Sequence, residues 1–186
     1  MILPIYAYGH EVLKKEGAVI DADYPEFKEL LDNMWETMYA AKGVGLAAQQ
    51  IGLAIKLFIV DTVQIEKEDK DHVGIKRAFI NATILEETGE EWSYEEGCLS
   101  IPDIHADVMR KPVITVRYME EDFVEKTETF DGLNARVIQH EYDHTMGKLF
   151  IEKINPLKRR LLGRRLENIR KGKIESDYRM RFGRIK

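Results

Sequence analysis

The segment from His140 to His144, His-Glu-Tyr-Asp-His, constrains the fold more than any other part of the sequence. On an α-helix, residues four apart are rotated by about 400°, so His140 and His144 project from nearly the same face, one turn apart. Two imidazoles placed in this way can bind one metal ion. Glu141 lies about 100° round the axis, where its carboxylate can meet a water molecule without binding the metal. A surface helix with incidental histidines is the alternative, but these three side chains would be costly to bury on an apolar helix without a function.

The motif does not itself supply a third protein ligand, which a catalytic metal site usually has beside an open position. The longer protease pattern His-Glu-x-x-His-x-x-Gly-x-x-His fits through Gly147, but Phe150 occupies its last histidine position and excludes that class. Glu152 or Glu167 could supply a distal carboxylate, although both stand among charged residues. Cys98, the single cysteine, is the better candidate. A Cys/His/His set suits Fe(II) or Zn(II).

Apolar residues at helical spacing predict three helices. The first covers residues 25–41, with Asp23 or Tyr24 as its expected cap. The second covers residues 133–146 and carries the histidine motif. The third covers about 156–171 and follows an Asn-Pro pair that favours a helix start. Its apolar positions, expected on the inner side, are Leu157, Leu161, Leu162, Leu166 and Ile169.

Segments rich in β-branched and aromatic residues predict strands that pair mostly antiparallel. They are residues 56–61, 77–85, 113–119 and 124–130. The charged stretch 64–76 is predicted to be a surface excursion. The order of elements indicates an α+β fold in one catalytic domain of residues 1–186. Mostly antiparallel strands would surround a central metal-binding helix, with an N-terminal helix and a basic C-terminal helix beside them.

Charge is distributed unevenly along the chain. Residues 153–186 contain 13 Lys and Arg against 3 Asp and Glu, whereas residues 1–152 contain 15 against 30. The basic C-terminal helix could simply expose its charges to solvent, or its positive charge could form a binding surface for nucleic acid. No apolar run approaches the roughly 20 residues of a membrane helix, and the N-terminus has no signal-peptide or transit-peptide pattern. We therefore expect a cytoplasmic protein with no membrane partner.

Three stretches together resemble the peptide deformylase family, in the bacterial-type branch whose members end in a helix. They are GVGLAAQQIG (Gly43 to Gly52), EEGCLSIP (Glu95 to Pro102) and QHEYDHTMG (Gln139 to Gly147). The resemblance implies removal of the formyl group from the N-terminal formyl-methionine of newly made polypeptides, with release of formate. It also implies one divalent ion, with Fe2+ as the native metal and Zn2+, Ni2+ or Co2+ possible in isolated protein.

The resemblance also assigns roles to residues of this sequence. The metal ligands would be Cys98, His140 and His144. Glu141 would act as base and then acid, while the Leu99 backbone N–H and the Gln50 side-chain amide would stabilise the oxyanion. Gly43 and Gly45 would let an extended peptide approach. The methionine pocket would be lined by Val44, Leu133, Val137 and His140. Glu96 and Arg110 would form an ion pair that braces the Cys98 loop, the alternative being two solvated charges.

Three positions depart from the family pattern. Thr145 stands where leucine is usual and, four residues after Glu141, could alter packing beside the base. His10-Glu11 replaces an Asp-Pro pair, and we expect only a local effect. His105 stands where relatives have arginine or another polar residue, which leaves the substrate contacts there open.

Because the implied substrate emerges from the ribosome, we expect the basic helix to bind ribosomal RNA or protein. Truncation after Asn155 is then expected to abolish ribosome co-sedimentation and leave small-peptide turnover largely intact. We also expect the iron-loaded enzyme to lose activity in air, because a thiolate ligand is open to oxidation.

Two other classes of protein remain open. A zinc endopeptidase using His140, His144 and a distal glutamate would keep its metal when Cys98 is replaced. A non-catalytic metal-binding or RNA-binding module would show no change of activity when Glu141 is replaced.

Overall fold

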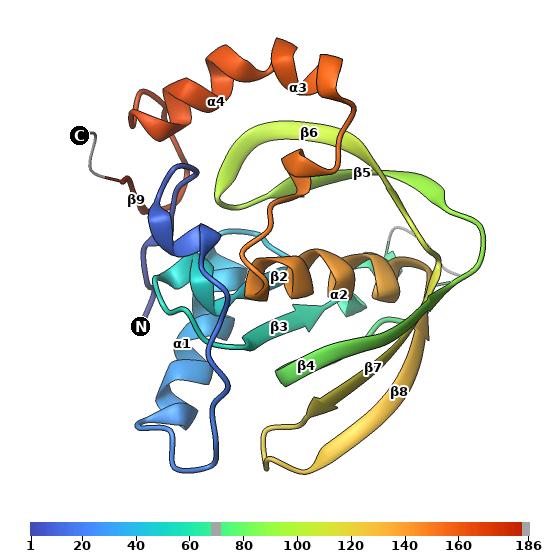
Figure 1. The fold of residues 1–186 in the computed structure, drawn as a ribbon. Helices are drawn as coiled ribbons and strands as arrows, with labels where there is room; N and C mark the ends of the chain where they lie inside the picture. Colours follow the sequence, from blue (N-terminus) through green and yellow to red (C-terminus); the bar gives the residue numbers. More distant parts are fainter. Residues whose placement is uncertain (68–71, 184–186) are drawn as a thin grey trace.

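The computed structural model describes residues 1–67 and 72–183, which form a mixed fold around one buried helix, α2 (Figure 1). The α-helices are α1 (Phe27–Ala40), α2 (Gly132–Thr145), α3 (Pro156–Leu161) and α4 (Gly163–Arg170). Short 3-10 helices are η1 (Glu11–Lys14), η2 (Ala48–Ile51), η3 (Val63–Lys67) and η4 (Phe150–Glu152). The strands are β1 (Ile5–Tyr6), β2 (Gly45–Ala47), β3 (Leu57–Asp61), β4 (Lys76–Thr88), β5 (Trp92–Cys98), β6 (Ile101–Arg110), β7 (Val113–Met119), β8 (Glu125–Asp131) and β9 (Met180–Arg181).

Five strands form one antiparallel sheet in the order β2-β3-β4-β7-β8. β5 and β6 form a separate antiparallel hairpin, and β1 pairs in parallel with β9. In Figure 1, α2 lies between the five-stranded sheet and this hairpin. The predicted α+β class with mostly antiparallel strands is therefore confirmed.

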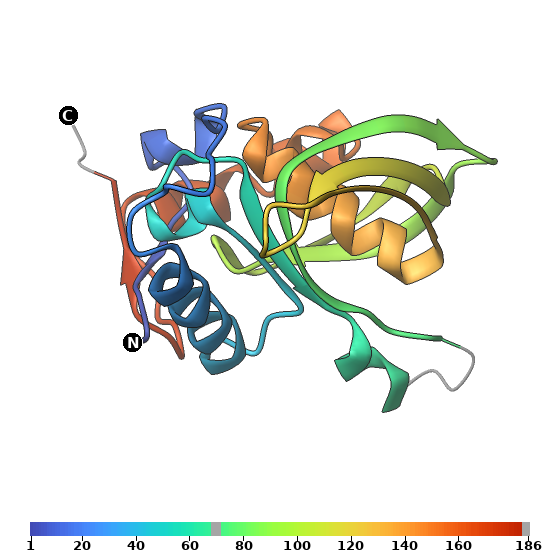
Figure 2. The same ribbon diagram turned by 90° about the horizontal axis from the view of Figure 1, so that it is seen from below.

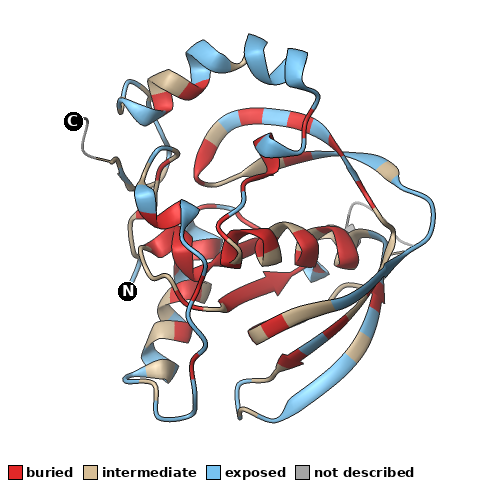
Figure 3. Cartoon of the chain, viewed as in Figure 1, coloured by how far each residue is buried: buried red, intermediate tan, exposed pale blue. Residues whose placement is uncertain are grey.

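Strand β3 is buried along its whole length because both of its faces are covered. Side chains alternate across a strand. Leu57 and Ile59 pack with Met34 and Met38 of α1. The side chains between them, Phe58 and Val60, belong to the cluster that contains Ala135 and Ile138 of α2. This alternation fixes α2 against the sheet, and Figure 3 shows both elements buried along most of their length.

Two details of the helix predictions were wrong. The residue that caps α1 is Glu26, in the left-handed conformation with φ 52°, and neither Asp23 nor Tyr24. The terminal helix is two helices, α3 and α4, that meet at Leu162. Asn155 does cap α3, since its side chain accepts a hydrogen bond from the Leu157 amide at 2.9 Å.

The prediction that the apolar residues of the terminal helix face inward was only partly correct. Leu166 and Ile169 of α4 are buried in the core, whereas Leu157 and Leu161 of α3 are 68% and 76% exposed. Figure 3 shows α3 exposed along its length. The helix axis changes direction at Leu162. The apolar residues of α3 and α4 therefore do not lie on one continuous buried face.

The strand predictions located β3, β4, β7 and β8, but they missed β2, the β5–β6 hairpin and the short strands β1 and β9. Strand β5 carries glutamates among its aromatic residues, and β6 contains a proline. The predicted surface excursion of residues 64–76 begins with η3, and its residues 68–71 lie outside the described residues. Within the described ranges, no helix has the length and apolar character needed to cross a membrane.

Candidate metal centre

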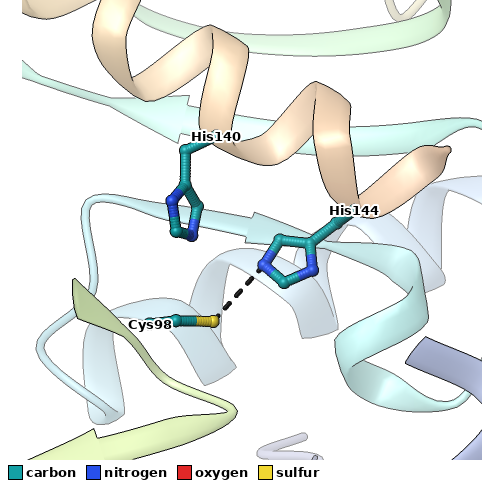
Figure 4. A group of neighbouring side chains, drawn as sticks. All are labelled: Cys98, His140 and His144. Carbon is teal, nitrogen blue, oxygen red and sulfur yellow. Dashed lines mark hydrogen bonds between the residues drawn. The ribbon is translucent and has the colours of Figure 1, made fainter. Parts of the chain in front are cut away.

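Helix α2 and the end of β5 bring Cys98, His140 and His144 together, as Figure 4 shows. Their ligand atoms all lie within 4.8 Å of one another, and Cys98 Sγ lies 3.3 Å from His144 Nε2. In a tetrahedral zinc site, bond lengths of about 2.0 Å to nitrogen and 2.3 Å to sulfur would place these two atoms about 3.5 Å apart. The three side chains therefore match the separation that one small divalent ion requires.

Two buried polar atoms at this cluster have no hydrogen-bond partner in the part of the chain that the structure describes. They are Nδ1 of His144 and Oε2 of Glu141, whose residues are 1% and 4% exposed. Burial, followed by the charges of His140 and Arg110, lowers the pKa of His144 well below its ordinary value. The neutral imidazole that results is the form that binds a metal.

Glu96 orients the other histidine. His140 Nδ1 lies 3.0 Å from Glu96 Oε2, so the carboxylate can accept the proton on Nδ1 and leave Nε2 as the nitrogen that would bind an ion. Burial opposes protonation of His140, but its contacts with Cys98 and Glu96 outweigh burial and raise its pKa, so a bound cation would displace the proton on Nε2. Burial opposes ionisation of Glu96, but its contacts with His140 and Arg110 outweigh burial and hold the pKa of this carboxyl well below its ordinary value. A carboxylate, a histidine and a metal ion in series is a common arrangement in metal sites.

Glu96 and Arg110 form a buried bidentate ion pair rather than two solvated charges. Arg110 Nε donates to Glu96 Oε1 at 2.6 Å and Arg110 Nη2 to Oε2 at 3.0 Å. Both side chains are 4% exposed. Glu96 is in β5 and Arg110 ends β6, so this pair links the two strands of the hairpin close to Cys98.

Sequence reasoning missed two members of this network. Arg136 is 2% exposed and donates to Glu96 Oε1 at 3.1 Å and to the Trp92 carbonyl at 2.7 Å. Asp143 accepts from Arg110 Nη1 at 2.8 Å. Arg136 precedes His140 by four residues and so shares its face, but this spacing alone does not show that its partner is Glu96 of β5.

Glu141 lies against the backbone of β2. A Cβ atom at Gly45 would be only 2.4 Å from Glu141 Oε1, so the carboxylate occupies the space that a side chain would need. Burial, assisted by the charge of Glu96, raises the pKa of Glu141 to about 7, against the opposing charges of His140 and Arg110. A divalent cation on the adjacent histidines would lower this pKa again.

Gln50 points its amide nitrogen at the same site. Its Oε1 accepts from the Ala47 amide at 2.9 Å, which fixes the orientation of the side-chain amide. Nε2 then lies 3.3 Å from Ser100 Oγ and 3.5 Å from Cys98 Sγ. A buried side-chain donor is thus held beside the partly buried thiol.

A cleft of about 720 Å³ opens over this centre. Every residue predicted to touch the substrate or carry the reaction lines it: Gly43, Val44, Gly45, Gln50, Leu99, Leu133, Val137 and Glu141. Cys98 and His140 also reach its wall, whereas His144 is not among the lining residues. One further part of the wall, residues 175–178 of the C-terminal tail, was not predicted.

The three departures from the family pattern are accommodated. Thr145 is 1% exposed, and its hydroxyl donates to the Tyr142 carbonyl at 2.7 Å, so it is not left unsatisfied. The His10 ring accepts from the Val12 amide at 3.3 Å, a local capping contact. His105 lies on the rim of the cleft against Gly97, where a Cβ atom would be 2.7 Å from its ring.

The distal glutamates are engaged elsewhere. Glu152 pairs with Lys14 and accepts from the Leu149 amide at 3.0 Å. Glu167 pairs with Arg170 and Lys171 on its own helix. Among the described residues, the cluster of close metal-ligating atoms is Cys98, His140 and His144.

The fold and this cluster define a metal-dependent hydrolase with one cysteine and two histidines at its centre. The sequence model of the polypeptide deformylase family matches residues 2–160. The chain is 57% identical to the peptide deformylase of Flavobacterium johnsoniae, over all of this chain and 98% of that protein. It is also similar to the solved peptide deformylases of Legionella pneumophila and Thermus thermophilus. The TM-scores are 0.80 and 0.82, with 34% identity in both cases, and the alignments cover 93% and 92% of this chain and 98% and 99% of those chains.

The chain belongs to the polypeptide deformylase family. It is a hydrolase that removes the formyl group from the N-terminus of newly made polypeptides, and the family works with a single divalent metal. The predicted family, enzyme class and reaction are thus confirmed, and the endopeptidase and the non-catalytic module are set aside.

Proposed function

We propose that Cys98, His140 and His144 hold the divalent ion of this deformylase. The proposal is carried by one observation: three ligand atoms from two separate elements lie within 4.8 Å of one another. Beside them lies the buried Oε2 of Glu141, which has no hydrogen-bond partner among the described residues. A divalent ion held there supplies Lewis acidity, which lowers the pKa of water and polarises a carbonyl oxygen. We propose Fe2+ as the native metal, since a mixed thiolate and imidazole set accepts Fe(II) as well as zinc, with Zn2+, Ni2+ or Co2+ as substitutes.

Glu141 is the proposed acid–base group. Its Oε2 is buried beside the ligand cluster without a partner, so it is free to take a proton from the attacking water. The same carboxyl, then protonated, can pass that proton to the amine that leaves. Gly45 makes this possible, because the absence of a side chain there leaves room for the carboxylate.

Gln50 and Leu99 are the proposed oxyanion donors. The Gln50 amide nitrogen is oriented toward Cys98 by the contact between Oε1 and the Ala47 amide. Leu99 follows the cysteine directly and lines the cleft, which supports its backbone N–H as the second donor. Fixed donors of this kind stabilise the negative charge that develops on the formyl oxygen in the transition state.

The substrate would enter along β2. Gly43, Val44 and Gly45 line the cleft on one side, and the partly buried Leu133 and Val137 line it from α2. The apolar side chains offer a pocket for methionine, while the backbone near β2 can pair with an extended peptide. Glu96 and Arg110 would support the Cys98 end of β5, so that the ligand keeps its position during turnover.

We further propose that α3 is the ribosome contact of a cytoplasmic protein made of one catalytic domain. It carries Lys158, Arg159 and Arg160 beside the exposed Leu157 and Leu161. Truncation after Asn155 would also remove β9 and the part of the cleft wall built from the tail, so it would change more than this surface. A double substitution, Arg159→Glu with Arg160→Glu, alters the surface alone.

The test of the metal proposal is formate release from formyl-Met-Ala-Ser by protein loaded with Fe(II), Ni(II) or Zn(II). We expect the iron form to be active when kept without oxygen and to decay in air as Cys98 is oxidised. Iron-loaded protein that kept full activity in air would contradict the role of Cys98 as an oxidisable ligand. An inactive iron form beside a fully active zinc form would contradict Fe2+ as the native metal.

A further inference from the structure

The C-terminal tail returns to the catalytic cleft. After α4 ends at Arg170, the chain reaches β9, which pairs with β1 near the N-terminus, as Figure 2 shows. The segment between them, Glu175 to Tyr178, lines the same cleft as Cys98 and Glu141. This tail lies beyond residue 160, where the match to the family's sequence model ends.

Tyr178 makes a specific contact inside the cleft. Its hydroxyl donates to the carbonyl of Leu99 at 2.7 Å. Leu99 lies in the turn between β5 and β6, directly after Cys98. The tail therefore holds the backbone of the residue whose N–H is the proposed oxyanion donor.

The same turn is held at its next residue from two other elements. The Tyr8 amide donates to the Ser100 carbonyl at 2.8 Å, and the Gln50 amide nitrogen lies 3.3 Å from Ser100 Oγ. Ser100 is buried, whereas Leu99 is only partly buried. Ser100 is held by the N-terminal segment and by η2, whereas the Leu99 carbonyl is held by the hydrogen bond from Tyr178.

The tail is anchored well enough to hold Tyr178 in place. The Ile5 amide donates to the Arg179 carbonyl and the Ala7 amide to the Arg181 carbonyl, both at 2.9 Å. Ile174, Met180 and Phe182 pack against the core cluster that contains Leu166 and Ile169. Burial raises the pKa of Tyr178 above its ordinary value, so the hydroxyl keeps its proton and remains a donor at neutral pH.

We propose that Tyr178 is a positioning residue for deformylation, which acts by fixing the Leu99 carbonyl and hence the direction of the Leu99 N–H. Peptide units are planar, so the N–H and the carbonyl of Leu99 are related only by the φ and ψ of that residue. A hydrogen bond that holds the carbonyl restricts both angles. The inference rests on the proposed role of Leu99, and it makes the tail a part of the catalytic machinery.

The test is Tyr178→Phe, which removes the hydroxyl and keeps the ring. We expect kcat on formyl-Met-Ala-Ser to fall by about 3- to 10-fold, the scale of one lost hydrogen bond. KM should stay within about twofold, because an oxyanion donor acts on the transition state more than on the bound substrate. Tyr118→Phe is the matched control, since it removes a hydroxyl that bonds Glu128 and Arg77 away from the turn.

The possible outcomes of this experiment distinguish a positioning role of Tyr178 from other roles. A purely structural role would lower the melting temperature of both variants and leave both kcat values at the wild-type level, which would overturn the inference. A rise of KM with unchanged kcat would also overturn it, because Tyr178 would then contribute only to substrate binding and would not position the Leu99 N–H. Wild-type protein loaded with metal but unable to release formate would instead contradict the proposed metal and catalytic residues.

Discussion

Replacement of Glu96 by glutamine tests the buried network behind the metal centre. In the structure, Glu96 Oε1 faces Arg110 Nε and Arg136 Nη1, and Oε2 faces Arg110 Nη2 and His140 Nδ1. A glutamine has one oxygen, so its amide nitrogen must face one of these two pairs of donors. In either orientation, two donors lose their acceptor and the negative charge that compensates two buried arginines is gone.

The expected cost follows from these contacts. A hydrogen bond to a charged group contributes about 1.5–3 kcal/mol, so two lost contacts amount to about 3–6 kcal/mol. This agrees with the roughly 3–5 kcal/mol seen when one partner of a buried ion pair is removed. Since a domain is stabilised by only about 5–15 kcal/mol, Glu96→Gln should be strongly destabilised. When the amide nitrogen faces His140, the ring loses the group that orients it, and metal affinity should also fall by about 10- to 100-fold.

The free energy of unfolding should be measured in urea on metal-free protein, because a bound ion adds stability by mass action. Metal affinity should be measured separately by competition with a chelator. The exposed neighbour Glu95 provides the control, and Glu95→Gln should change the unfolding free energy by no more than about 0.5 kcal/mol. If Glu96→Gln unfolds within about 1 kcal/mol of the wild type and binds metal equally well, the reasoning about this network is refuted.

Four further variants test other parts of the structure. Cys98→Ala should lose the metal ion, whereas Glu167→Gln should keep it; metal analysis that gave equal contents for both variants would argue against Cys98 as a ligand. Gly45→Ala should lower kcat by about 10²-fold without loss of metal, because its Cβ atom would displace the Glu141 carboxylate, and near-normal turnover would refute the close approach. Burial raises the pKa of Glu152, but Lys14 and the Leu149 amide outweigh it and hold that pKa below its ordinary value. Its stabilising effect is therefore present above the ordinary carboxyl pKa and lost as the pH falls through the lowered pKa, so the melting temperatures of Glu152→Gln and wild type should differ at pH 7 and converge in acid. Arg159→Glu with Arg160→Glu should abolish salt-sensitive co-sedimentation with ribosomes and preserve peptide turnover, with the exposed Arg117→Glu as control; unchanged co-sedimentation would refute α3 as the contact.

The parts of the fold that were predictable are those with local signals. Helix α2 and strand β7 were located within one residue, because their apolar spacing and flanking residues are encoded in a short window. The pairing of Cys98 with the two histidines followed from a motif that lacked one ligand. The β5–β6 hairpin was missed because β5 carries glutamates and β6 contains a proline. Its inner side chains, such as Ile104, Ala106 and Val108, do alternate with exposed residues, but they pack on Leu149 and Phe150, which are distant in the sequence.

The remaining features depend on contacts between distant segments. Arg136 and Asp143 looked like ordinary charged residues of a helix, and only the approach of β5 and β6 makes them members of a buried network. The place of Tyr178 in the cleft depends on the pairing of β9 with β1, across most of the chain. The break between α3 and α4 was likewise invisible, because leucines continue at helical spacing through it.

The central claim is that Glu141, beside an ion held by Cys98, His140 and His144, carries out the proton transfers of deformylation. The most direct test is formate release from formyl-Met-Ala-Ser by Glu141→Gln, with the metal content measured on the same sample. We predict one divalent ion per chain, as in the wild type, and a fall in kcat of about 10²–10⁴-fold, the usual contribution of a general acid–base group. Glu141→Gln that held its metal and released formate at the wild-type rate would contradict the account.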